Sequence, residues 1–333
     1  MRKPRRRPPG NNNEETMRIS GFTIARNARI YDFPLVESIR SVLDIVDEFV
    51  VAVGAGEDDT EELVRSIGSP KIRIINTVWD TEKYKGGGTI LAQQTDIALR
   101  ACTGDWCFYI QADEVLHESA LPVVKAACEK YLDDKRVDGF VLKYVHLYAD
   151  YCHCIEALHF AYPYEIRIVR NRRDIHSWRD AQSFKINPNF DGDYLAKEGT
   201  SKLRCVFLDA RMFHYGWSRD PRCMSRKMVK MRKMYHPEYE EDAAEYHDYG
   251  NLSLMPLFEG EHPEVMRERV AKMSWGHCLR YDGPPPQERK IFAPKYRLLG
   301  WIENRLLGGR RIGGFRNFYK AGFFRLPDGS RER

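Results

Sequence analysis

Residues 104–118, GDWCFYIQADEVLHE, place an apolar run directly before a cluster of polar side chains. The run at 106–110 predicts a strand that is covered on both faces. Gln111, Asp113 and Glu114 follow it at once. In an open α/β sheet, ligands bind outside the carboxyl ends of the strands. The stretch therefore predicts a binding site at the end of this strand, where a carboxylate such as Asp113 could hold Mg²⁺.

Strand-like and helix-like patterns alternate along the first 135 residues. The strand-like runs are 18–25, 48–53, 71–75 and 106–110, and the helical patterns are 34–46, 61–67, 89–102 and 119–132. Such alternation with right-handed crossovers predicts an α/β fold with a mostly parallel sheet flanked by helices. The loops after the first, second and fourth strands should then meet at one edge of the sheet, and they carry Asn27, Asp58, Asp59 and Asp113.

The pattern changes at about residue 137. Aromatic and β-branched residues dominate 137–151, 162–170 and 203–213, which predicts further strands. Helical patterns follow at 224–235 and 263–272. We expect this second half to be mixed or antiparallel and to extend the edge of the first.

Charge is concentrated at the two ends of the chain. Of a total of +5, residues 1–16 contribute +3 and residues 290–333 contribute +8, so the body between them is mildly acidic. This argues against nucleic-acid binding by the core. Residues 1–16 contain no apolar segment, so we expect a disordered basic leader and not a signal peptide. The sequence contains no run of 18 apolar residues, so it does not predict a transmembrane helix.

The eight cysteines show no repeated CxxC spacing, which favours reduced thiols in a cytosolic protein. Cys152-His153-Cys154 could suggest a metal site. A lone CHC without a second ligand pair is more often part of the packing.

The motifs taken together resemble the GT-A fold of family 2 glycosyltransferases, over about residues 17–220. The segment that ends in Ala112-Asp113-Glu114 resembles the DADE segment of bacterial sugar transferases in that family. The other residues that carry the resemblance are Asn27, Glu57-Asp58-Asp59-Thr60, Gly86-Gly87-Gly88, Ala92-Gln93-Gln94 and Gly104-Asp105-Trp106.

The resemblance implies a nucleotide-sugar donor at the carboxyl edge of the sheet. It implies that Asp58 or Asp59 reads the base or ribose, and that Asn27 and Gln94 lie at the nucleotide pocket. Gln111-Ala112-Asp113 stands where the family has its DxD motif, so Asp113 would hold Mg²⁺ or Mn²⁺. Gln111 replaces the first acid; its amide can touch ribose hydroxyls but binds metal weakly.

The second half adds candidates for the metal and for the acceptor side. His214, just after the strand-like run at 203–213, resembles the late histidine that completes the metal and diphosphate site. An inverting transfer needs a carboxylate to take the acceptor proton. The resemblance makes Asp180 the first candidate for this base, with Asp191 second and Glu165 third.

Structural roles remain open for several of these residues. Asp113 and Glu114 could cap the next turn, and Asp58 or Asp59 could cap a helix. His214 could be a structural histidine that is satisfied by hydrogen bonds.

The resemblance divides the chain into functional parts. We expect a leader at 1–16, a nucleotide-sugar-binding half at 17–135, an acceptor-side half at 136–275 and a basic, helical C-terminal extension at 276–333. Within this extension, residues 294–307 combine apolar and basic side chains. They could either pack on the domain or lie on an anionic membrane surface, which would suit a lipid-linked acceptor.

The predicted function is the inverting transfer of a sugar from a nucleotide diphosphate to a glycan or lipid-linked acceptor, in cell-envelope or surface glycan synthesis. A sugar-nucleotidyltransferase is an alternative, but Arg26-Asn27-Ala28 does not resemble its Gly-rich signature. A catalytically silent scaffold that binds a glycan or a partner is a second alternative, which Gln111 leaves open.

Overall fold

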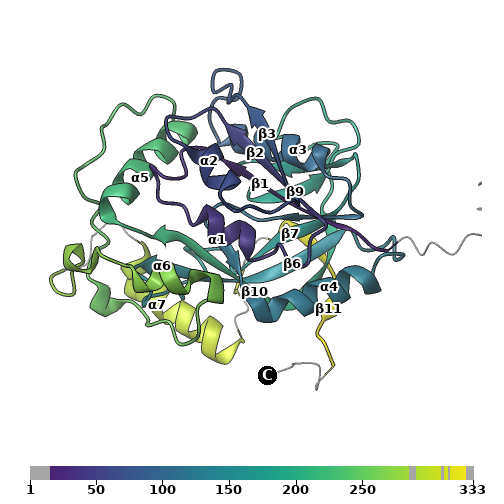
Figure 1. Cartoon of the computed structure of the whole chain (residues 1–333). Coiled ribbons are helices and arrows are strands. Elements are labelled where there is room, and N and C mark those ends of the chain that lie inside the picture. The colour runs from purple at the N-terminus through teal and green to yellow at the C-terminus, as the bar shows by residue number, and fades with distance from the viewer. Residues whose placement is uncertain (1–15, 285–289, 309–310, 314–315, 328–333) are drawn as a thin grey trace, which may run out of the picture.

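The computed structural model describes residues 16–284, 290–308, 311–313 and 316–327 (Figure 1). Its centre is a nine-stranded sheet with the order β11-β10-β6-β7-β4-β1-β2-β3, in which the short β5 also pairs with β10. The strands are β1 (Ile19–Ala25), β2 (Glu48–Gly54), β3 (Ile72–Thr77), β4 (Trp106–Tyr109), β5 (Glu114–Leu116), β6 (Gly139–Ala149), β7 (Tyr164–Arg170), β10 (Leu203–Ser218) and β11 (Phe318–Phe324). A separate hairpin consists of β8 (Ile175–Trp178) and β9 (Ser183–Ile186).

The pairing confirms the predicted α/β class with a mostly parallel sheet. Strand β1 pairs in parallel with β2 and β4, β2 with β3, and β10 with β6 and β11. The antiparallel strand β7 lies between β4 and β6 and joins the two halves. The second half is therefore mixed, as the sequence predicts, and it extends the same sheet.

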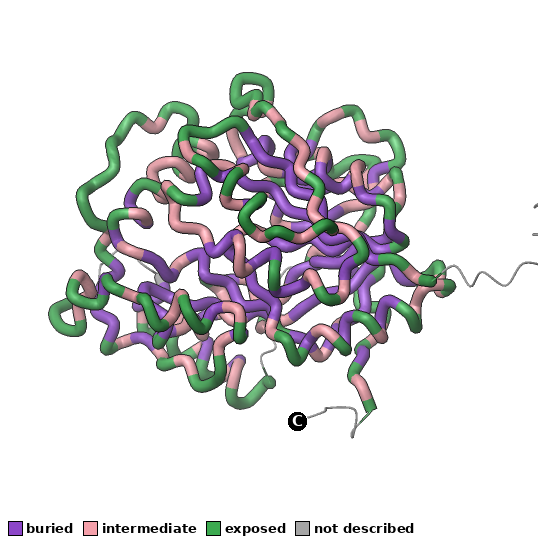
Figure 2. The backbone as a smooth tube through the Cα atoms, in the orientation of Figure 1, coloured by how far each residue is buried: buried purple, intermediate pink, exposed green. Residues whose placement is uncertain are grey.

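Helices cover both faces of the sheet (Figure 1). They are α1 (Leu35–Arg40), α2 (Thr60–Arg65), α3 (Thr89–Ala101), α4 (Leu121–Lys130), α5 (Pro221–Tyr235), α6 (Arg267–Ala271) and α7 (Pro294–Trp301). Helices α1, α2 and α4 contribute to one apolar core, and α3 and the β8–β9 hairpin to the core on the opposite face. Figure 2 shows the buried residues running along the sheet between these layers.

Helix α1 is shorter than the helix predicted at 34–46. It ends at Arg40, and turns follow. The Ser41 hydroxyl donates a hydrogen bond to the Ser38 carbonyl oxygen and accepts one from the amide of Leu116, which ties this turn to β5. Val42 and Val46 are nevertheless buried. The apolar spacing was thus a correct sign of burial, although the backbone is not helical throughout.

The C-terminal segment contains the predicted helix. The helix α7 continues into a π-helical turn at Ile302–Leu306, and the Asn304 amide donates to the Glu156 carbonyl oxygen at 2.8 Å. Glu303 is buried and contacts His159 at 2.9 Å. One side of the segment therefore packs on the domain, while Leu298 and Trp301 are exposed. No helix in the described part of the chain is long and apolar enough to cross a membrane.

A fully buried ion pair holds the turn after β4. The guanidinium of Arg167, on β7, donates to both carboxylate oxygens of Glu114, at 2.9 and 2.7 Å. The same carboxylate accepts hydrogen bonds from the Tyr144 hydroxyl at 2.7 Å and from the backbone N–H of Gln111 at 3.0 Å. Glu114 is thus a structural residue that fixes the turn carrying Gln111 and Asp113.

We predict that Arg167→Met lowers the free energy of unfolding by about 3–5 kcal/mol, because it leaves the Glu114 carboxylate buried without its charge partner. Urea denaturation measures this change. The double variant Glu114→Gln/Arg167→Met should lose less than the sum of the two single variants, since the two residues interact. A single Arg167→Met variant within 1 kcal/mol of the wild type would contradict this role.

Candidate functional site

A pocket of about 630 Å³ opens at the carboxyl ends of β1 and β4, and we refer to it as the edge pocket. Arg26 follows β1, Gln111 and Asp113 follow β4, and His214 comes from β10. The wall opposite the sheet is α5. The side chains of α5 that line the pocket lie at helical spacing and are Met224, Lys227, Met228, Met231, Arg232 and Tyr235.

Asp113 is a buried carboxylate among cations. Its Oδ2 lies 3.0 Å from Lys227 Nζ and 3.5 Å from an Arg219 guanidinium nitrogen. Burial alone would raise the pKa of Asp113, but the charges of Lys227 and Arg219 outweigh it and hold this pKa well below its usual range. Asp113 is therefore ionised at neutral pH. Burial and Arg219 lower the pKa of Lys227 to about 8.

His214 lies beside the same carboxylate. Its Nε2 is 3.8 Å from Asp113 Oδ1, and its Nδ1 is 2.9 Å from Nδ1 of His146. Burial lowers the pKa of His214 well below its usual range, so the imidazole is neutral at pH 7. Gly216 allows this arrangement, because a Cβ there would come within 2.3 Å of His214 Nε2.

Asp113 and His214 suit a divalent cation as two of its ligands. A carboxylate oxygen and a neutral imidazole are ligands that Mn²⁺ accepts, and waters and phosphate oxygens fill the other positions in such sites. No group of three or more protein ligands gathers within the described residues, and this holds for Cys152-His153-Cys154 too. Lys227 already contacts Asp113, so its ammonium and a metal would compete for one carboxylate.

Asp180 reaches the edge pocket from the turn between β8 and β9. The residues on both sides of it, Arg179 and Ala181, adopt φ values of 58° and 60°, in the left-handed region. The Tyr235 hydroxyl, at the end of α5, donates a hydrogen bond to the Asp180 carboxylate. A Cβ on Gly88 would meet the Asp180 side chain at 2.7 Å. Asp180 is thus held between α5 and the Gly86–Gly88 turn.

Three buried N–H groups at or beside the edge pocket have no hydrogen-bond partner among the described residues. They are Arg26 Nε, Trp79 Nε1 and Arg219 Nε. A buried donor without a partner is costly. These groups are therefore consistent with a polar ligand in the pocket, and the positive charges favour an anionic one.

The other residues that were predicted to bind the donor, Asn27, Asp58, Asp59 and Gln94, do not line the edge pocket. Asn27 accepts from the Glu57 amide, and Asp58 accepts from the amides of Arg29, Ile30 and Thr60. Asp59 pairs with Arg29 on the surface. The buried Gln94 bonds to Thr77 and to the Val78 carbonyl oxygen. These contacts organise the loops, and a role in donor binding stays a prediction.

The two other base candidates lie in different surroundings. Asp191 is exposed and lines neither this pocket nor its neighbour; its carboxylate accepts from the amide of Asp193. Glu165 is buried in the wall of a second cavity and accepts from the amides of Gln182 and Asn317, at 3.1 and 3.2 Å. Burial raises the pKa of Glu165 to about 7.

Sequence reasoning missed Lys227, Arg219, Trp79 and Tyr235. Lys227 and Tyr235 belong to a helical pattern whose predicted role was only structural, and Trp79 and Arg219 lie outside every predicted element. Helix α5 reached the pocket through long-range packing. A signal was present, since Lys227 interrupts an otherwise methionine-rich face at 224, 228 and 231.

Comparisons with known proteins give weak likenesses. No family model and no curated protein matches the chain. Among solved structures, S. aureus TarS is 15% identical with a TM-score of 0.37, over 68% of this chain and 41% of its own. Two structures of Mycobacterium tuberculosis glucosyl-3-phosphoglycerate synthase are 22% and 21% identical, each with a TM-score of 0.27 over 42% of this chain.

The two synthase structures hold Mn²⁺ with UDP and phosphoglyceric acid, and Mn²⁺ with UDP-glucose and glycerol 3-phosphate. The matched parts are 49% and 50% of those chains, so this chain spans half or less of the length of the proteins named here. At TM-scores below 0.5, the likeness says nothing of the chemistry of this chain.

We predict that Glu165 makes stability depend on pH. Its pKa of about 7 in the folded protein exceeds the ordinary 4.5. Below pH 4.5 both states carry the proton. Between pH 4.5 and 7 only the unfolded chain loses it, so the free energy of unfolding falls by up to about 3 kcal/mol as pH rises.

Glu165→Gln should remove this loss, so its stability relative to the wild type should increase from pH 5 to pH 8 in chemical denaturation. Glu129→Gln, at an exposed position of α4, is the matched control and should not change the profile. Parallel pH profiles for wild type and Glu165→Gln would exclude a raised pKa.

Proposed function

We propose that this chain is a glycosyltransferase of GT-A type, which moves a sugar from a nucleoside diphosphate donor to an acceptor hydroxyl. The observation that carries the proposal is the edge pocket. An ionised Asp113 lies there with Lys227, Arg219 and His214, at the carboxyl ends of parallel strands. Phosphate groups are ligands for such a cluster of cations and N–H donors.

The pocket has distinct parts for the two ends of a nucleotide. Its apolar wall, which includes Trp79, Leu91 and Met231, suits a flat base. The Lys227 side chain lines the pocket and suits the diphosphate, which must leave as the sugar is transferred, and the buried Arg219 beside Asp113 adds positive charge. A divalent cation held by Asp113 and His214 would add positive charge at the leaving diphosphate.

Asp180 is the proposed general base. Its carboxylate lines the edge pocket, with the Tyr235 hydroxyl bonded to it. It would accept the proton of the acceptor hydroxyl as that oxygen attacks the anomeric carbon, while the bond from this carbon to the diphosphate breaks. Attack from the side opposite the leaving group inverts the anomeric configuration.

The acceptor is proposed to be a glycan, which could be lipid-linked and part of the cell envelope. The exposed Leu298 and Trp301 of α7 would suit contact with a membrane surface. Peripheral attachment of a cytoplasmic enzyme would give access to such an acceptor.

We predict that one of UDP, GDP, dTDP and CDP raises the melting temperature when Mn²⁺ is present, and raises it less in EDTA. Asp113→Ala should abolish the metal-dependent part of the shift, because it removes the carboxylate at the centre of the site. Asp133→Asn, an exposed aspartate outside the pocket, is the control. A folded protein that responds to none of the four would refute the donor site.

We predict that Asp180→Asn lowers kcat by about 10²–10⁴-fold, the usual contribution of a general base, without loss of nucleotide binding. Release of nucleoside diphosphate from the sugar nucleotide that matches the binding screen measures turnover. Asp191→Asn should retain activity because Asp191 lies outside the pocket. The reverse ranking of the two variants would transfer the role to Asp191.

Assays of the products released separate the alternatives. A nucleotidyltransferase would release pyrophosphate from a nucleoside triphosphate and a sugar phosphate. A silent scaffold would bind the nucleotide and give no turnover with any acceptor tried.

A further inference from the structure

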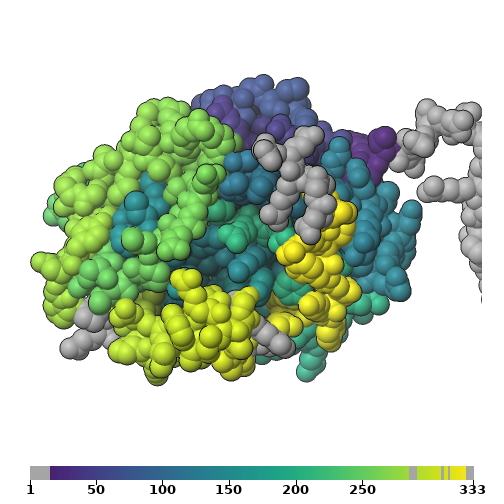
Figure 3. Space-filling model, turned by 90° about the horizontal axis from the view of Figure 1, so that it is seen from below, coloured from purple at the N-terminus to yellow at the C-terminus, as the bar shows by residue number. Residues whose placement is uncertain are grey.

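A second cavity, of about 1160 Å³, adjoins the edge pocket, and we refer to it as the basic cleft. Tyr162 and Gln182 line both cavities. Gln182 also lies two residues after Asp180, the proposed base. The basic cleft is therefore the space from which a second substrate could reach the donor. The face in Figure 3 carries the C-terminal residues, in yellow, around a hollow in the surface.

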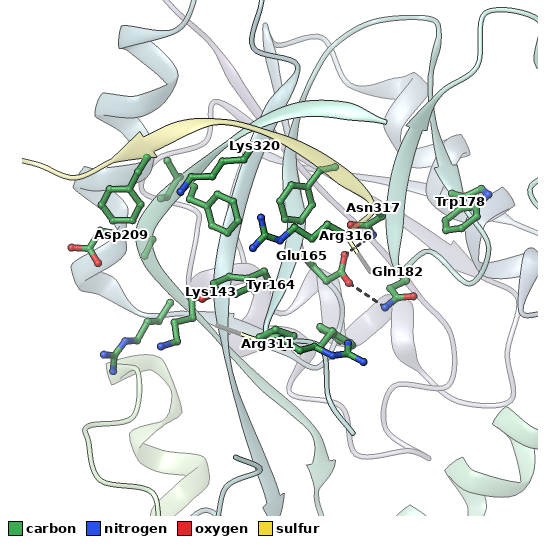
Figure 4. Close-up of a pocket in the computed structure, with 18 of the residues that line it drawn as sticks. Lys143, Tyr164, Glu165, Trp178, Gln182, Asp209, Arg311, Arg316, Asn317 and Lys320 are labelled. Carbon is green, nitrogen blue, oxygen red and sulfur yellow. Dashed lines mark hydrogen bonds between the residues drawn. The ribbon is translucent and has the colours of Figure 1, made fainter. Parts of the chain in front are cut away.

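Strands of the sheet place three cations in the cleft: Lys143 on β6, Arg211 on β10 and Lys320 on β11. Figure 4 shows Lys143 and Lys320 on opposite sides of the space, and Glu165 beside Gln182 and Asn317. Burial and the charge of Arg211 lower the pKa of Lys143. The like charges are thus close enough to repel each other.

Five more cations line the cleft. Arg179, Lys185 and Lys197 come from the hairpin region, and Arg311 and Arg316 from the C-terminal segment. None of the eight cations forms a salt bridge with a carboxylate in the part of the chain that the structure describes. Eight cations without a carboxylate partner among the described residues thus gather around one cavity, whereas Arg172, outside it, pairs with Asp138 and Asp174.

The two acids of the cleft do not balance this charge. Asp209 pairs with Arg325 at 2.8 Å. Glu165 has a pKa raised to about 7 by burial, so it is protonated in a large fraction of molecules at neutral pH. A nearby anion would favour this neutral form further.

Two buried donors in the cleft also have no partner among the described residues. They are Trp178 Nε1 and Arg311 Nε. Trp178 packs under two of the cations, with the Arg179 guanidinium 4.3 Å and the Lys185 ammonium 4.2 Å from its ring. The cleft thus offers N–H donors and positive charge together, which is the combination that binds oxyanions.

We propose that the basic cleft binds the acceptor and that this acceptor is polyanionic: a sugar or polyol chain that carries several phosphate or carboxylate groups. The number of unpaired cations requires more than one anionic group. The aromatic walls, Tyr164, Phe207 and Phe323, suit the carbon skeleton between them. The proposal rests on the proposed function, because it assigns the second substrate of that reaction.

The test is direct binding of defined polyanions by titration calorimetry, with the matching nucleoside diphosphate present to fill the edge pocket. Inorganic polyphosphate and polygalacturonate are the probes, and uncharged dextran is the neutral control. Binding of polyphosphate or polygalacturonate, with no binding of dextran, supports the proposal, and their ranking distinguishes phosphate from carboxylate. Affinity should fall as salt screens the charges.

Two double variants test the location. Lys143→Gln/Arg211→Gln removes charge from the sheet, and Arg311→Gln/Arg316→Gln removes it from the C-terminal segment. Each should weaken probe binding at least about tenfold, since each removes two charge-assisted contacts. The first should fold as stably as the wild type or more so, because it relieves repulsion. Arg40→Gln/Lys125→Gln, on α1 and α4, makes the same charge change outside the cleft and should bind normally.

The outcomes separate the two proposals. Two results would overturn the acceptor assignment and leave the donor site standing. The first is nucleotide binding without polyanion binding, and the second is polyanion binding that both cleft variants retain. Absence of nucleotide binding would overturn the proposed function, whatever the polyanions do. Tight binding of single-stranded DNA with none of polyphosphate or polygalacturonate would also overturn the assignment, because it would indicate a nucleic-acid ligand.

Discussion

The buried ion pair between Glu114 and Arg167 is the interaction on which the geometry of the site depends. Arg167 belongs to β7, the antiparallel strand that joins the two halves of the sheet, and Glu114 belongs to the turn after β4. The pair therefore connects the two halves of the sheet. Because Glu114 also accepts from the Gln111 amide, the backbone that presents Asp113 cannot shift without breaking buried hydrogen bonds.

The sequence was sufficient to place Gln111 and Asp113, but Asn27, Asp58 and Asp59, which also follow strands, do not line the pocket. The alternation of patterns predicted the parallel strands, and their order brought Gln111 and Asp113 to the carboxyl edge. Asp180 and His214, which were placed by resemblance alone, line the same pocket as Asp113. Glu114 shows the limit of such reasoning. Its carboxylate binds Arg167, which lies 53 positions away in the sequence. A local pattern cannot reveal such a partner, so it could not tell whether Glu114 binds a ligand or a buried arginine.

The basic cleft could not be found in the sequence because no segment contains it. Its cations come from three strands, a hairpin region and the C-terminal segment. The basic C-terminal end was evident from composition, and a membrane surface was one reading of its charge. In the structure Arg311 and Arg316 contribute to a cavity wall. Lys320 belongs to β11, an edge strand with mostly exposed side chains that the sequence analysis did not predict, and β11 pairs with β10.

Residues of strand β10 line both cavities. Arg211 faces the basic cleft and His214 faces the edge pocket, three residues later on one continuous strand. At about 3.3 Å per residue, the two positions are separated by roughly 10 Å along the strand. Since this part of the strand is held between β6 and β5 by backbone hydrogen bonds, this separation is fixed. In the proposed enzyme the strand would therefore set the distance between an anionic group of the acceptor, bound near Arg211, and the diphosphate of the donor, bound near His214.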